Sequence, residues 1–118
     1  VGLVTLAVPQ RLRPALAGQF PEATYPAVTD TDVLGVSTAN LILGALKSYR
    51  AILAGPGLGD AGSFMGALLD GLRDPSISEP PPLVIDADGL NLLAAMPDWP
   101  QRRQLLNGAP LGHEHWSY

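Results

Sequence analysis

Short apolar runs alternate along the chain with segments whose apolar residues recur at helical spacing. Residues 2–8 form an almost continuous apolar run with β-branched members, a pattern typical of a strand buried on both faces. Residues 51–54 and 83–85 are shorter runs of the same kind. Residues 23–28 are predicted as a strand at a sheet edge, because Pro26 removes one donor from the hydrogen-bond ladder.

Four further segments have the pattern of helices. Residues 11–18 are predicted as a short helix that ends at Gly18. In the other three segments apolar side chains recur on one helical face: Val36, Ala39, Leu43 and Leu46 in a segment that runs to about residue 50, then Met65, Leu68, Leu69 and Leu72, and finally Leu92, Leu93 and Met96 before Pro97. The order β-α-β-α-β-α-β-α predicts an α/β fold with a mostly parallel, four-stranded sheet and helices on both faces.

Length and composition indicate one domain. The chain has 118 residues, of which 47% are hydrophobic and 15% are charged. A length below ~150 residues fits a single domain, and the apolar fraction is enough to build a core. We therefore expect one α/β domain over residues 1–118, with residues 105–118 as an irregular tail because they show no helical or strand period.

The charge and the cysteine count exclude several classes of function. A net charge of −4 argues against a nucleic-acid or membrane-surface partner, and no apolar run reaches the ~18–20 residues that a membrane span needs. The chain contains no cysteine, which excludes disulfides, thiolate nucleophiles and cysteine-type zinc sites and fits a reducing compartment. We therefore expect a cytoplasmic protein.

A glycine-rich turn, Gly55-Pro-Gly-Leu-Gly59, follows the strand predicted at residues 51–54. In parallel α/β sheets, ligands bind at the carboxyl ends of the strands. Glycines let a ligand approach the backbone, and the helix that follows offers N–H groups to an anion, so this turn is suited to a phosphate or pyrophosphate. The alternative is a plain tight turn in which Asp60 or Ser63 caps the helix.

An acidic segment, Asp86-Ala-Asp88-Gly-Leu-Asn91, follows the strand predicted at residues 83–85. If the strand continues through it, Asp86 and Asp88 point to the same side and are suited to holding Mg²⁺ through water or to orienting ribose hydroxyls. Alternatively, Asp88 is only the N-cap of the next helix, which leaves Asp86 as the ligand candidate. Asn91 has either a capping or a binding role.

Two features suggest other chemistry. Gly57, Gly59 and Gly62 match the pattern G-x-G-x-x-G, with Asp86 about 24 residues further on, which is compatible with a Rossmann-type NAD-binding domain of an oxidoreductase. In that fold the pattern normally follows the first strand, whereas two apparent βα units precede it here. His113 and His115 lack a third zinc ligand at a recognisable spacing and are predicted to lie in an exposed tail, so we predict no metal site.

Four segments together resemble the ribokinase-like domain of the ADP- or ATP-dependent NAD(P)H-hydrate dehydratases. They are residues 1–8 followed by Pro9, Phe-Pro-Glu at 20–22, Ala-Gly-Pro-Gly-Leu-Gly at 54–59 and Pro-Leu-Val-Ile-Asp-Ala-Asp-Gly-Leu-Asn-Leu-Leu-Ala at 82–94. The ordered pair GPGLG and DADGLN, with a strand before each, is the specific part of the pattern. The resemblance covers roughly residues 1–104 and implies a lyase that dehydrates the S epimer of hydrated NADH or NADPH, with ADP or ATP and Mg²⁺ as cofactors.

The resemblance also implies roles for individual residues. Gly55, Gly57 and Gly59 would contact the hydrated nucleotide, and Asp86, Asp88 and Asn91 would line the same cleft. After DADGLN the family has a T-P-H-P-G-E segment and a G-x-G-D that carries the catalytic aspartate, and neither follows DADGLN in these residues. The Gly59-Asp60 pair belongs to the substrate-side loop, so we assign no catalytic residue, and we do not transfer the family histidine's role to His113.

These departures predict a partial domain that is inactive by itself. A truncated sheet leaves edge groups unpaired, and self-association would cover them, so we expect a homo-oligomer. A third possibility is a non-catalytic remnant that packs on a partner.

Overall fold

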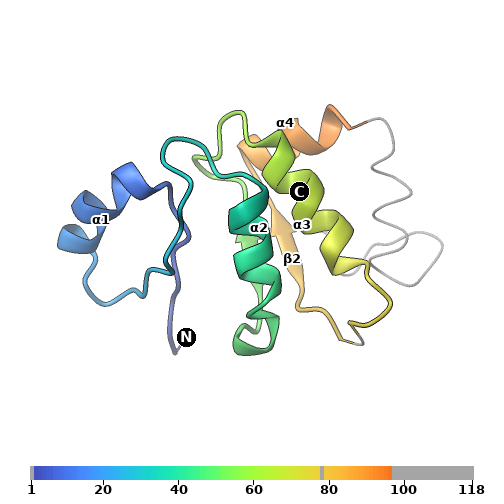
Figure 1. The fold of residues 1–118 in the computed structure, drawn as a ribbon, viewed down its shortest axis with the longest axis horizontal. Helices are drawn as coiled ribbons and strands as arrows, with labels where there is room; N and C mark the ends of the chain where they lie inside the picture. The colour runs from blue at the N-terminus through green and yellow to red at the C-terminus, as the bar shows by residue number, and fades with distance from the viewer. Residues whose placement is uncertain (1, 78, 97–118) are drawn as a thin grey trace.

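The computed structural model describes residues 2–77 and 79–96. Figure 1 shows the elements in chain order: the 3-10 helix η1 (Gln10–Leu12), α1 (Arg13–Gln19), α2 (Val36–Leu43), the 3-10 helix η2 (Leu46–Ser48), β1 (Ile52–Ala54), α3 (Gly62–Leu72), β2 (Leu83–Ile85) and α4 (Asp88–Ala94). None of the described helices is long and apolar enough to cross a membrane. The tail predicted at residues 105–118, with His113 and His115, lies outside the described residues.

The sheet is parallel, as predicted. Strand β1 pairs with β2 in the register Ile52 to Leu83, Leu53 to Val84 and Ala54 to Ile85. Helix α3 makes the connection between the two strands, so that the chain runs β1, α3, β2. A parallel pair of strands joined by a crossover helix is the βαβ unit of α/β proteins, which confirms the fold class.

The sheet is smaller than the four strands that the sequence predicts. Residues 2–8 and 23–28 form no strands and meet in a single parallel bridge, in which the Leu6 N–H donates to the Thr24 carbonyl at 2.9 Å and the Thr24 N–H donates to the Val4 carbonyl at 2.9 Å. In a parallel ladder, alternate residues face the partner strand. Pro26 is therefore the next position after Thr24, and its missing N–H ends the ladder.

A groove separates residues 5–8 from β1. The Ile52 N–H donates to the Pro82 carbonyl at 2.9 Å, and the Ala54 carbonyl accepts the Asp86 N–H at 3.1 Å. Leu53, between them, therefore directs its own N–H and C=O to the other edge of β1. That edge and residues 5–8 line the same groove, so the apolar run at the start of the chain lies beside the sheet without joining it.

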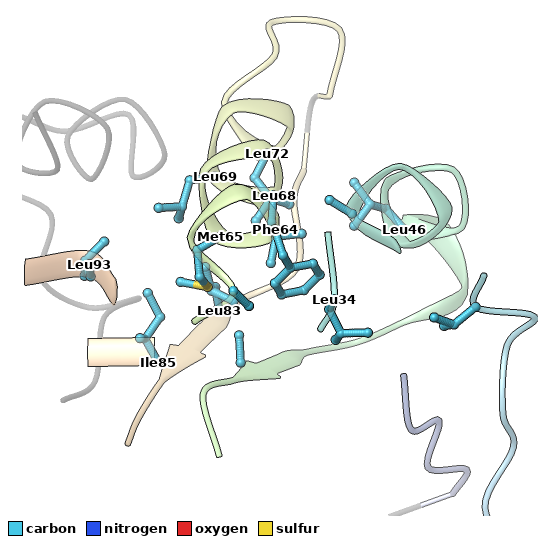
Figure 2. Packing of buried hydrophobic residues seen from close by; sticks show 14 residues of the cluster. Leu34, Leu46, Phe64, Met65, Leu68, Leu69, Leu72, Leu83, Ile85 and Leu93 are labelled. Carbon is cyan, nitrogen blue, oxygen red and sulfur yellow. The ribbon is translucent and has the colours of Figure 1, made fainter. Parts of the chain in front are cut away.

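The core lies between the sheet and the pair α2 and α3, which run side by side over one face of the strands (Figure 1). The predicted apolar face of α3 is confirmed: Phe64, Met65, Leu68, Leu69 and Leu72 are all buried. Figure 2 shows these side chains directed toward Leu83 and Ile85 of β2 and toward Leu34 and Leu46. This burial is what fixes α3, and with it the loop at its N-terminus, against the sheet.

The other face of the sheet is open in the described part of the chain. Successive strand residues point to opposite faces, and Leu53 and Val84 are 64% and 38% exposed. The sequence predicts helices on both faces of the sheet, but no described helix covers Leu53 and Val84.

Helix α2 is shorter than the predicted segment that runs to about residue 50. It ends at Leu43, and η2 follows as a separate turn. Its N-terminus is held by Asp30, whose Oδ2 accepts hydrogen bonds from the Gly35 N–H at 2.9 Å and from the Thr38 hydroxyl at 2.5 Å. These bonds, that of the Thr38 hydroxyl above all, lower the pKa of Asp30.

Candidate functional site

The loops that follow β1 and β2 are in backbone contact. Gly55 has φ 152°, and a Cβ at this position would overlap the carbonyl oxygen of Asp86. Gly89 is equally confined, because a Cβ there would lie 2.8 Å from the Ala54 carbonyl oxygen and 3.0 Å from the Gly55 Cα. Glycine at these two positions therefore permits the close approach of the two segments, GPGLG and DADGLN.

The first half of the glycine-rich segment is a type II turn. Pro56 and Gly57 are its central residues, Gly57 has φ 77°, and the Leu58 N–H donates to the Gly55 carbonyl at 3.1 Å. Proline at the first central position and a positive φ at the second are what this turn type requires. Gly59, with φ 60°, then redirects the chain toward α3.

Asp88 joins the second segment to this turn. Its Oδ2 accepts the N–H of Gly59 at 2.9 Å. Asp88 is the first residue of α4, and the N-cap position belongs to Ala87 with no side-chain hydrogen bond. The interpretation of Asp88 as an N-cap is therefore wrong, because its carboxylate is directed to the glycine turn.

The same holds for the helix after the glycine turn. The N-cap of α3 is Ala61, again with no side-chain hydrogen bond, so the alternative in which Asp60 or Ser63 caps this helix is wrong. The preceding turn is instead shaped by the Gly55–Leu58 and Gly59–Asp88 hydrogen bonds. The partial positive charge of the α3 N-terminus therefore has no side-chain acceptor at its cap.

Asp86 lies where the strand pattern stops. Strand β2 ends at Ile85, and Ala87 has φ 50° and ψ −126°, a left-handed conformation that is costly for a residue with a Cβ. The prediction that Asp86 and Asp88 share one side of a continuing strand therefore does not apply. Asp86 Oδ1 accepts the Ala87 N–H at 2.8 Å, and the Asp86 side chain is exposed, as is that of Asn91 on α4.

The groove beside β1 has a volume of about 310 Å³, at the lower end of the range for small-ligand sites. Its lining includes residues 5–8 and 51–56, Leu58, Phe64 and Tyr49. Asp86, Asp88 and Asn91 are not among its lining residues. The glycine turn thus borders the groove and also contacts the acidic segment.

The described residues contain no group of three or more His, Asp or Glu side chains placed to hold a metal ion. Asp86 is one exposed carboxylate, and Asp88 already accepts one hydrogen bond from the chain. Mg²⁺ is commonly held by one or two carboxylates together with substrate phosphates, and Asp86 fits that shared mode of binding.

In α/β proteins, ligands bind at the carboxyl ends of the parallel strands, and this βαβ unit has two contacting loops there. The family model of the NAD(P)H-hydrate dehydratases matches residues 1–106, and the chain belongs to this family. This membership favours the dehydratase resemblance over the Rossmann-type alternative.

Three curated relatives agree with the family match. Each is a bifunctional NAD(P)H-hydrate repair enzyme. The one from Synechocystis sp. is 36% identical over 97 residues, which are 80% of this chain and 16% of that protein. The one from Leishmania infantum is 38% identical over 90 residues (75% and 15%), and the one from Thermosynechococcus vestitus is 33% identical over 102 residues (85% and 18%). The chain thus spans less than a fifth of the length of each.

Proposed function

We propose that this chain is the substrate-binding part of an ADP- or ATP-dependent NAD(P)H-hydrate dehydratase, and that its ligand is the S epimer of hydrated NADH or NADPH. The observation that carries the proposal is the contact between the GPGLG turn and the DADGLN segment in a chain that belongs to this family. Both segments end at the same edge of a parallel sheet, which is where such folds bind ligands.

In this proposal the glycine turn meets the phosphates of the hydrated nucleotide. Gly57 and Gly59 have no atoms within 4 Å of a built Cβ, so a ligand can approach their backbone. The N-terminus of α3 adds N–H groups and a partial positive charge that favour an anion. The carboxylate of Asp86 and the amide of Asn91 are suited to the hydroxyls of the ligand, and Asp88 lines the same edge with its Oδ2 on the Gly59 N–H.

ADP or ATP with Mg²⁺ is proposed as the cofactor, and the nucleotide supplies the free energy that drives dehydration. Asp86 would contribute to holding Mg²⁺ from its exposed position. The family's catalytic aspartate lies in a G-x-G-D after DADGLN, and no such segment follows DADGLN in these 118 residues, so we expect the chain to bind hydrate without turnover. We also propose a homo-oligomer and a cytoplasmic location.

Calorimetry of the 118-residue chain with NADH hydrate, NAD and ADP, each titrated separately, tests the binding proposal. Preference for the hydrate supports it. Preference for NAD supports the oxidoreductase alternative, with Gly57, Gly59 and Gly62 as its binding residues, and binding of none of the three supports a non-catalytic remnant.

Recovery of the dihydropyridine absorbance from NADH hydrate, in the presence of ADP or ATP and Mg²⁺, tests catalysis. We expect no recovery with this chain. Recovery that the substitution Asp86→Asn abolishes would contradict this expectation and would place the catalytic group at Asp86.

A further inference from the structure

The glycine turn is closely packed at Gly55 and open around Gly57 and Gly59. At the base, a Cβ at Gly55 would overlap the backbone of Asp86, so this end cannot move without separating the two segments. At the tip, a Cβ at Gly57 or Gly59 would meet nothing within 4 Å, and the Gly59 residue is exposed. Leu58, between these two glycines, packs against the hydrophobic core. Packing therefore fixes the base of the turn and Leu58, but it does not fix Gly59.

A side-chain hydrogen bond holds Gly59 to the acidic segment. The Gly59 N–H donates to Asp88 Oδ2 at 2.9 Å across 29 positions of sequence. The acceptor is carried by the first turn of α4, which is anchored in the core through the buried Leu93. The bond thus connects Gly59, a residue type with wide backbone freedom, to a helix that is anchored in the core.

We propose that Asp88 is a positioning residue, whose carboxylate fixes the conformation of the GPGLG turn and so holds the backbone of Gly57 in place for the ligand. Asp88 acts through the turn, by accepting a hydrogen bond, and its negative charge is not what the ligand requires. The effect on ligand binding rests on the function proposed above, whereas the effect on the turn does not.

Four variants separate acceptor geometry from charge. Asp88→Ala removes both, Asp88→Asn keeps an acceptor oxygen at the same position without the charge, and Asp88→Glu keeps the charge but displaces the carboxylate by one methylene. Asp60→Ala, one residue beyond the turn and with an exposed side chain, removes a nearby carboxylate without removing the hydrogen bond. If Asp88→Ala does not fold, Asp88→Asn and Asp88→Glu still give opposite expectations.

The first measurement is amide hydrogen exchange at Gly59 by NMR on the 118-residue chain without ligand. We expect Asp88→Ala and Asp88→Glu to speed this exchange by about tenfold or more, and Asp88→Asn and Asp60→Ala to change it by less than about threefold. Unchanged exchange in Asp88→Ala, or in Asp88→Glu if Asp88→Ala does not fold, overturns the inference whether or not any ligand binds.

The second measurement is the affinity for NADH hydrate by calorimetry. We expect Asp88→Ala to weaken binding by about tenfold and Asp88→Asn to restore it to within about threefold. Binding that is weakened equally by Asp88→Asn and Asp88→Ala would show that the ligand requires the charge, and would overturn the inference. If neither the original chain nor any variant binds hydrate, the proposed function fails. The exchange data still decide whether Asp88 holds the turn.

Discussion

Among the described non-glycine residues, Ala87 alone has a positive φ, and it lies between the two aspartates of the acidic segment. Its φ of 50° and ψ of −126° belong to a region that costs a residue with a Cβ on the order of 1–3 kcal/mol. The strand pattern ends at Ile85, and α4 begins at Asp88, directly after the bend at Ala87. The direction of the Asp88 carboxylate therefore depends on a strained backbone.

Relief of that strain is measurable. Ala87→Gly is expected to raise the free energy of unfolding by about 1 kcal/mol, since glycine adopts this conformation without a steric penalty but loses more conformational entropy on folding. Urea unfolding followed by circular dichroism provides the value. The matched variant Ala95→Gly, at a right-handed position at the end of α4, is expected to give no gain, and a gain of equal size there would argue against the strain.

A second prediction at the residue scale concerns Asp30. Because hydrogen bonds from Thr38, Gly35 and Ser37 lower its pKa, the carboxylate contributes stability above the unfolded-state value of about 3.9. This contribution is lost as the pH falls through the lowered pKa. Asp30→Ala is thus expected to lower the urea midpoint at pH 7 and to differ much less from the original chain near pH 2. Asp32→Ala, which removes only an exposed ion pair with Arg11, should have little effect at pH 7.

At the scale of the elements, α3 connects the core to the candidate site. Its apolar residues face the sheet and α2 (Figure 2). Its N-terminus follows the glycine turn in the chain. Leu68 is fully buried at the centre of this face. The position of the turn therefore depends on packing several residues away from it.

Leu68→Ala is expected to lower the free energy of unfolding by about 3 kcal/mol, because it leaves a cavity in a packed core. Leu41→Ala, on α2 and 39% exposed, is expected to cost less than about 1 kcal/mol. Chemical denaturation of both variants compares them directly. Equal losses would mean that α3 is not the centre of the core.

At the scale of the whole molecule, the open face of the sheet bears on the proposed oligomer. Leu53 and Val84 point away from α2 and α3 and are exposed, and the Leu53 N–H and C=O are directed to the edge of β1 that borders the groove. Exposed apolar strands with an unpaired edge favour pairing with another chain. The oligomer proposal thus has a specific surface on this chain.

Leu53→Lys is expected to shift the chain toward the monomer, since a lysine on an exposed edge strand opposes pairing. Light scattering over a range of protein concentrations measures the shift. Leu3→Lys, at a position that is 84% exposed and outside the two strands, serves as the control. A chain that is monomeric before substitution, at every concentration, would contradict the oligomer proposal.

The sequence by itself determined the elements whose signals are local. The runs at 51–54 and 83–85, the apolar face of α3 and the glycine turn are each encoded within a few neighbouring residues, because helical and strand periods and turn chemistry act over short distances. The resemblance carried by GPGLG and DADGLN led to the family for the same reason.

Only the tertiary structure decided which of these elements meet. The bond from Gly59 to Asp88 and the set of donors around Asp30 join residues that no local period relates. The extent of the sheet was likewise not predictable from residues 2–8, since an apolar run specifies a tendency to be buried and not the strand that it pairs with. Pairing depends on the free edge that the rest of the fold presents, and here Pro26 and the groove beside β1 limit it.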